Sequence, residues 1–271
     1  MVLFCGVEAL CDADLETQAI VLAPAVALLG LPHGALDLPV ARARGLAQGK
    51  LGSLLFLLSY FIVTLSVVAI WLALPEASLA AFLIYSAIHF SRDWDYATAA
   101  WRLVGGVSAV AAPALTHPAA VREIFAHLTF APSTGTVEAL AWSGATALIA
   151  FLALLFGSRR SAQATYEVIG IWGAAALLPP LLYFVVYFCF LHSPRHLTEA
   201  LREVEWNPRV VMTVAMLSIT AGIAGAGVYY SLPVFEVPPS IVRVVFIGLA
   251  GLTVPHMALL AMTSPRRAVE P

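Results

Sequence analysis

The chain has 271 residues, of which 61% are hydrophobic and 11% are charged, and its formal net charge is -2. Soluble domains carry about 25% charged residues, so this composition excludes an ordinary aqueous fold. A mean hydropathy of +0.90 over the whole chain predicts an all-α, polytopic transmembrane helical bundle. Because the sequence has no basic stripe, a nucleic-acid-binding surface is also excluded.

The segment before the first apolar stretch, residues 1–16, contains four acidic residues and no basic one. Secretory signal peptides begin with a basic region, so a cleaved signal is not expected. We expect this segment to lie outside the membrane and residues 1–271 to form a single transmembrane domain.

Apolar stretches of about 20 residues, long enough to cross a hydrocarbon core of about 30 Å, follow one another along the chain. The sequence predicts seven to nine spans, because two stretches are short and the Pro179–Pro180 pair is compatible with either a break between two helices or a kink in one. We expect an irregular connection at residues 116–136 and a cytoplasmic tail at residues 263–271. The nine stretches are residues 17–40, 51–74, 77–95, 102–115, 137–157, 164–178, 180–202, 208–231 and 240–262.

The loops predict the orientation, because cytoplasmic loops are enriched in Lys and Arg. Arg42, Arg44 and Lys50 follow the first span, whereas the loop after the second span has only Glu76. We therefore expect a multi-pass protein of the cell (inner) membrane, with its N-terminus outside and its C-terminus in the cytoplasm.

Five of the seven histidines lie within apolar stretches or at their edges, where an ionisable side chain is costly and usually faces the bundle interior. With nine spans, all five lie on helices that run from outside to inside, in the middle or inner part of each. They can therefore meet in one layer and hold a metal ion. These residues are His33, His89, His192, His196 and His256.

His192 and His196 are four residues apart, which places both imidazoles on one helical face provided that Pro194 does not break the helix. A single histidine of this kind could instead form a hydrogen bond to a neighbouring helix and do nothing more. Several at one depth favour a metal site. Neutral imidazoles suit iron, copper, zinc or nickel, and open coordination positions suit a divalent iron that binds dioxygen.

Two aspartates repeat one spacing, because Asp37 and Asp93 each stand four residues after a histidine, His33 and His89. A carboxylate one helical turn away can orient a metal-binding imidazole. Both aspartates are equally compatible with interfacial charges at helix ends.

Aromatic residues near the histidines could line an apolar channel for a substrate, and packing or anchoring at the membrane interface is the alternative. These residues are Tyr85, Phe90, Trp94, Trp172, Tyr183, Phe184, Tyr187 and Phe188.

Four motifs, LPHGALD (31–37), IHFSRDW (88–94), FLHSPRH (190–196) and VPHM (254–257), occur here in the order seen in one known family. In this respect the chain resembles the Brp/Blh family of membrane β-carotene 15,15'-dioxygenases, and THPAAVREIF (116–125) is also similar to a family segment. The resemblance extends from the first apolar stretch to the last.

The resemblance implies oxidative cleavage of β-carotene, or a related carotenoid, by dioxygen at the central 15,15' double bond, giving two all-trans-retinal molecules. It implies that four histidines bind Fe(2+), with membrane lipid around the protein and a possible functional link to a retinal-binding opsin. It gives no catalytic residue beyond the metal centre. The positions of His256, Asp37 and Asp93 in the sequence, and not the resemblance, predict supporting residues, with His256 as an alternative fifth ligand. The implied ligands are His33, His89, His192 and His196.

One departure from the family is Ser91, which stands where the family usually has glycine and puts the fit of the substrate in doubt. Three other functions stay open. A membrane di-iron hydroxylase or desaturase would need about eight histidines in several boxes, a carotenoid- or retinal-binding protein would not cleave its ligand, and a membrane cytochrome would ligate haem.

Overall fold

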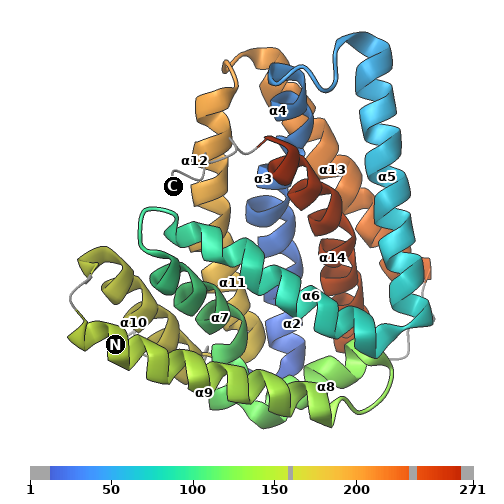
Figure 1. Cartoon of the computed structure of the whole chain (residues 1–271). Helices are drawn as coiled ribbons and strands as arrows, with labels where there is room; N and C mark the ends of the chain where they lie inside the picture. The colour runs from blue at the N-terminus through green and yellow to red at the C-terminus, as the bar shows by residue number, and fades with distance from the viewer. Residues whose placement is uncertain (1–12, 158–160, 232–236, 264–271) are drawn as a thin grey trace, which may run out of the picture.

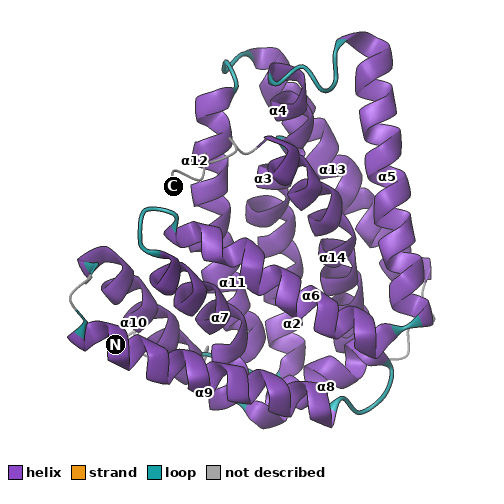
Figure 2. Cartoon of the chain, viewed as in Figure 1, coloured by secondary structure: helices purple, strands orange, loops and turns teal. Residues whose placement is uncertain are grey.

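The computed structural model describes residues 13–157, 161–231 and 237–263, and within these ranges it contains helices and no strand (Figures 1 and 2). The predicted all-helical fold is therefore confirmed for the described residues. The elements are α2 (Leu15–Ala25), η1 (Val26–Gly30), α3 (Leu31–Ala35), α4 (Asp37–Ala43), α5 (Gly49–Ala73), α6 (Pro75–Phe90), η2 (Ser91–Trp94), α7 (Ala99–Thr116), α8 (Pro118–Thr129), α9 (Thr134–Phe156), α10 (Ala162–Leu177), α11 (Pro180–Tyr187), η3 (Phe188–His192), α12 (Ser193–Glu203), α13 (Pro208–Ser231) and α14 (Val237–Thr263).

Six helices in the described part of the chain are long and apolar enough to cross a membrane. In α5 and α13 only 6% and 0% of the apolar window is buried inside the protein, so these helices present leucine, isoleucine and phenylalanine outward. Such surfaces are stable in lipid and not in water. The six are Leu15–Ala43, Gly49–Ala73, Ala99–Thr116, Thr134–Phe156, Pro208–Ser231 and Pro238–Met262.

The other three predicted stretches are not confirmed as spans. Stretches 77–95 and 164–178 correspond to α6 and α10, each 16 residues long. Stretch 180–202 corresponds to α11, η3 and α12, whose last part is polar. The chain breaks at Pro179, because Leu178 and Pro179 are extended and α11 begins afresh at Pro180.

The connection at residues 116–136 is not irregular as predicted, because it contains the helix α8. Pro118 occupies the first turn of α8, where a missing N–H costs nothing, and Phe130 ends the helix in a left-handed conformation (φ 60°). α8 buries one apolar face under α9 and α14 and so closes one end of the bundle.

Asp14 marks the start of the first helix. Its carboxylate accepts a hydrogen bond of 2.8 Å from the Thr17 backbone N–H, and this bond lowers the pKa of the Asp14 carboxyl below its usual value. Residues 1–12 of the predicted N-terminal segment 1–16 lie outside the described residues. The same holds for most of the predicted tail at 263–271.

The helices cross at steep angles. In Figure 1, α5, α12 and α14 run upright, whereas α9 lies across the lower part of the molecule, with α7 packed against it. Small residues allow these crossings, because a Cβ on Gly144 of α9 would lie only 2.9 Å from the Ala111 carbonyl oxygen of α7. The α6–α7 crossing is as close at Gly106, where a Cβ would overlap the Ala87 carbonyl oxygen of α6.

We predict that Gly106→Ala lowers the stability of the protein by about 1–3 kcal/mol, because the new methyl group forces α6 and α7 apart. Gly170→Ala on α10 is the matched control, since nothing lies within 4 Å of a Cβ there. Thermal unfolding of the detergent-purified variants measures the difference. Equal midpoints for the two variants would contradict the close α6–α7 contact.

Candidate metal centre

Two of the helices that carry histidines contain a π-helical turn beside the imidazole. In the first, η1 ends three residues before His33, and in the second, η3 ends at His192. Such wide turns are frequent at functional sites because they re-aim the side chains that follow. A Cβ on Gly30 would lie 2.6 Å from a Phe188 ring carbon, so glycine lets the two π turns approach each other.

His89, His192 and His196 form a compact, fully buried group whose ligand atoms all lie within 4.8 Å of one another. The His192 and His196 ring centroids are 4.4 Å apart, and the His89 ring lies 4.7 Å and 5.2 Å from them. Pro194 does not separate the pair, because it falls in the first turn of α12, where proline fits a helix. This group could hold a metal ion.

His33 and His256 complete the cluster from another side. The His33 ring centroid lies 5.5 Å from His192, and the His256 centroid lies 5.4 Å from His89. His33 and His256 are 5.6 Å from each other. The structure therefore brings together all five histidines that the apolar stretches contain. His117 lies elsewhere, next to Thr116 at the end of α7.

Several imidazole nitrogens in this cluster are buried and have no hydrogen-bond partner. Leaving such an atom unpaired costs about 1–3 kcal/mol, so their convergence requires an explanation beyond packing. Neutral imidazoles with free nitrogens are suitable ligands for iron, copper or zinc. Within the described residues, the atoms without a hydrogen bond are His89 Nδ1, His192 Nε2, His196 Nε2 and His256 Nε2, and of these His196 Nε2 lies 3.4 Å from an Asp93 carboxylate oxygen.

Each of the two aspartates contacts a histidine from a different helix. Both carboxylate oxygens of Asp93 lie 3.1 Å from His192 Nδ1. The oxygens of Asp37 lie 2.8 and 3.0 Å from His256 Nδ1. In each pair the carboxylate accepts the N–H and leaves Nε2 of the imidazole free, as in a carboxylate–histidine–metal arrangement.

The prediction that each aspartate orients the histidine four residues before it is therefore wrong. Nδ1 of His33 turns instead to the Gly30 carbonyl oxygen at 2.5 Å. Asp93 lies in the 3-10 turn η2 rather than in an α-helix, so its side chain no longer shares a face with His89. Both aspartates stand at helix ends but are buried at 5% exposure, so their side chains face other parts of the protein.

The turn that carries Asp93 is fixed from α12 and α10. Arg195 donates a hydrogen bond of 2.7 Å to the Asp93 backbone carbonyl and forms an ion pair with Glu167 of α10. The Tyr187 hydroxyl donates to the Asp93 carboxylate at 2.6 Å. Sequence reasoning missed Arg195 and Glu167, although Arg195 stands inside the HSPRH motif and Glu167 inside an apolar stretch.

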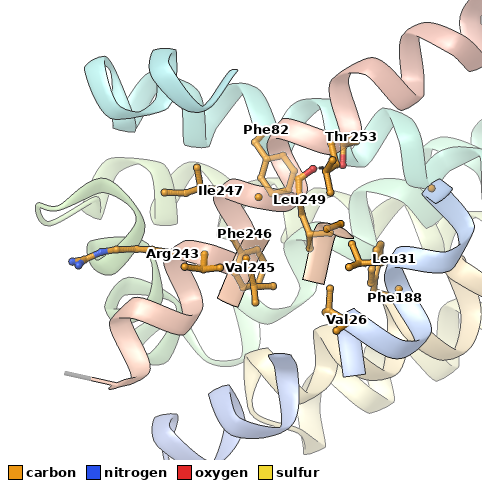
Figure 3. Close-up of a pocket in the computed structure, with 18 of the residues that line it drawn as sticks. Val26, Leu31, Phe82, Phe188, Arg243, Val245, Phe246, Ile247, Leu249 and Thr253 are labelled. Carbon is orange, nitrogen blue, oxygen red and sulfur yellow. Dashed lines mark hydrogen bonds between the residues drawn. The ribbon is translucent and has the colours of Figure 1, made fainter. Parts of the chain in front are cut away.

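A cavity of about 1360 Å³ adjoins the histidine cluster, and its wall is mostly apolar. His33, His89 and His256 line it, whereas His192 and His196 lie behind them. Figure 3 shows part of the wall, in which Leu249 and other side chains of α14 lie near Val26 of η1, Leu31 of α3 and Phe82 of α6. The volume exceeds the roughly 300–1,000 Å³ of common ligand pockets, so it can take a long ligand.

Half of the aromatic residues singled out in the sequence line this cavity. The ones that do are Phe90, Tyr183, Phe184 and Phe188. The ones that do not are Tyr85, Trp94, Trp172 and Tyr187. Trp94 is fully buried against Gly105, and the Trp172 indole donates a hydrogen bond to the Ser108 hydroxyl, so both serve in packing.

Ser91 does not line the cavity. Its hydroxyl donates a hydrogen bond of 2.7 Å to the Ile88 carbonyl oxygen at the end of α6. Because Ser91 departs from the family pattern, we expected it to affect how the substrate fits. Its position outside the cavity wall gives no basis for that effect.

The sequence profile of the beta-carotene 15,15'-dioxygenase family matches residues 24–263 of the chain. The chain belongs to this family. One relative, a beta-carotene 15,15'-dioxygenase from uncultured marine bacterium 66A03, is 32% identical over 251 residues, which cover 87% of this chain and 90% of the relative. No solved structure matches the chain. The family assignment predicted from the four motifs is thereby confirmed, and it places the chain among oxidoreductases.

We predict that Asp93→Asn weakens metal binding by about 10- to 100-fold, because an amide accepts the His192 N–H less strongly and can donate in its place. Asp95→Asn is the matched control, since Asp95 is exposed and pairs with Arg102. Metal content after dialysis against a graded chelator measures the effect. If the two variants retained equal metal, Asp93 would have no part in the site.

Proposed function

We propose that the protein cleaves β-carotene at the central 15,15' double bond with dioxygen and releases two all-trans-retinal molecules. The reaction takes place at a non-haem Fe(2+) held by His33, His89, His192 and His196. Family membership supports the reaction. The observation that carries the proposal is the contact between a long apolar cavity and a group of imidazoles with unpaired nitrogens.

When bound, the iron would supply the redox chemistry that activates dioxygen, which no side chain of the protein can supply. The residues around it hold the ligands in place. Asp93 keeps the His192 proton on Nδ1 and directs Nε2 inward, and Arg195 fixes the turn that carries Asp93. Asp93, His192 and Arg195 belong to η2, η3 and α12, so contacts between three helical elements make the position of the His192 ring rigid.

The cavity wall binds and orients the polyene. The Phe184 ring stacks on Phe188 with centroids 5.1 Å apart and lies tilted against Phe246 at 5.0 Å, so the three rings form an aromatic cluster in the cavity wall. Two tyrosine hydroxyls of the wall are engaged, because Tyr183 donates to the Ala109 carbonyl oxygen and Tyr60 to Asp37. Neither tyrosine is free to act as a general acid, and the mostly apolar wall suits cleavage of an apolar double bond.

We also propose that α6, α10 and the α11–α12 helix join the six long helices as additional spans, giving nine, in a cell (inner) membrane. Arg44 pairs with Glu203 at 2.5 Å, which brings the basic loop after α4 and the end of α12 to the same side. This end is cytoplasmic by the enrichment of Arg and Lys there, with the N-terminus outside and the tail inside. β-Carotene then enters laterally from the lipid, and retinal leaves for a binding protein such as an opsin.

The test is product analysis by chromatography after purified protein is incubated in air with β-carotene and ferrous iron. We expect two retinal molecules per β-carotene, and none from His192→Ala, in which an unpaired ligand atom is removed. Intact carotenoid bound to iron-loaded wild-type protein would refute the reaction and favour a carotenoid-binding function. A Soret band in the purified protein would favour a haem cytochrome.

We predict that Leu249→Trp lowers the rate of β-carotene cleavage by at least about tenfold, because the larger side chain fills part of the cavity. In an apolar pocket, one methylene group more or less changes the binding free energy by about 1–3 kcal/mol. Metal content should stay unchanged, since Leu249 is neither a proposed ligand nor a hydrogen-bond partner of one. Leu249→Met conserves the volume and is the control. A Trp variant that cleaves β-carotene at the rate of the Met variant would show that the substrate binds elsewhere.

A further inference from the structure

The hydrogen bonds behind the His192 ligand form a chain of three side chains. The Tyr187 hydroxyl donates to Asp93 at 2.6 Å, and Asp93 accepts the His192 Nδ1–H at 3.1 Å. All three side chains are buried, and none of them lines the cavity. The Nε2 atom of His192 is left unpaired and buried among the other imidazoles.

The same chain occurs a second time, on different helices. The Tyr60 hydroxyl of α5 donates to Asp37 at 3.0 Å, and Asp37 accepts the His256 Nδ1–H at 2.8 Å. The Nε2 atom of His256 is likewise buried and unpaired. This second Tyr–Asp–His chain differs in one respect, because Tyr60, Asp37 and His256 all line the cavity.

His256 is as close to the buried group as His33 is. Its ring centroid lies 5.4 Å from His89 and 6.4 Å from His196, whereas the His33 centroid lies 5.5 Å from His192 and 6.3 Å from His196. His256 is 6% exposed, and Pro255 does not interrupt α14 before it. Position and burial therefore give no reason to accept His33 as a ligand and to leave His256 out.

The charges of the two aspartates also require a partner. Asp37 and Asp93 are buried, and neither forms an ion pair with a lysine or arginine side chain in the part of the chain that the structure describes. Two carboxylates in an apolar bundle are costly unless a nearby charge compensates them. One divalent cation among neutral imidazoles supplies two positive charges between them.

We propose that His256 is a fifth imidazole ligand of the metal ion, oriented by Asp37 and Tyr60 as His192 is oriented by Asp93 and Tyr187. The inference rests on the proposed metal site but not on the proposed reaction. His33, His89, His192, His196 and His256 would hold the ion, which when bound would supply the chemistry that activates dioxygen. The Tyr60–Asp37–His256 chain lines the cavity, so the cavity reaches the cluster beside His256.

The test is titration of full-length, metal-free protein in detergent with Co(2+), whose visible absorption reports the number and kind of its ligands. We expect His256→Ala to weaken Co(2+) binding by more than about 100-fold and to change the visible spectrum, since a ligand loss exceeds the roughly 10- to 100-fold effect of losing an outer partner. His117→Ala, which removes a histidine outside the cluster, should leave both unchanged. A His256→Ala protein with wild-type affinity and spectrum overturns the proposal.

Two further measurements keep the test decisive if His256→Ala does not fold. Asp37→Asn keeps every imidazole and should weaken Co(2+) binding by about 10- to 100-fold, as Asp93→Asn does; wild-type affinity in Asp37→Asn overturns the proposal. X-ray absorption of the Co(2+) wild-type protein should require five imidazoles, and a four-imidazole shell overturns it. Wild-type protein that binds the ion through five imidazoles and makes no retinal refutes only the proposed reaction.

Discussion

The constraint on which the structure depends is the cost of polar nitrogen and carboxylate atoms inside an apolar bundle. Four of the five imidazoles and both carboxylates of the cluster are buried, and only His33 is partly exposed. In the Asp93–His192 pair, a hydrogen bond satisfies one ring nitrogen of the imidazole. The other ring nitrogen has no hydrogen bond and points toward a common centre. Without a cation at that centre, the bundle would hold two negative charges and several unpaired nitrogens at a cost of several kcal/mol.

Much of the site could be predicted from the sequence, because histidines in apolar stretches have few stable positions other than the bundle interior. The depth of His33, His89, His192, His196 and His256 along their helices was sufficient to predict that they meet. The partners of the aspartates could not be predicted. A one-turn spacing identifies neighbours within a helix, whereas the observed pairs join helices whose relative rotation is set by packing.

Local backbone geometry explains the other differences from the sequence-based picture. Three irregular turns change the helical phase by a fraction of a turn: the π turn before His33, the π turn at His192 and the 3-10 turn that carries Asp93. No residue pattern in the sequence predicted these turns. The helix α8 was missed because proline and threonine at its ends resemble a loop, while its apolar face is covered only by distant helices. In Figure 1, α6, which is 16 residues long, runs at an angle to the upright α5.

The two Tyr–Asp–His chains divide the centre into two sides. On one side Tyr187 and Asp93 are enclosed by protein and tied through Arg195 to α10, which makes that half of the ligand set rigid. On the other side Tyr60 and Asp37 face a cavity of about 1360 Å³ with phenylalanine walls. The cavity gives a long apolar molecule access to the cluster from this second side. Under the proposed function, the buried half would fix the position of the ion, and the open half would determine which bond of the substrate lies next to it.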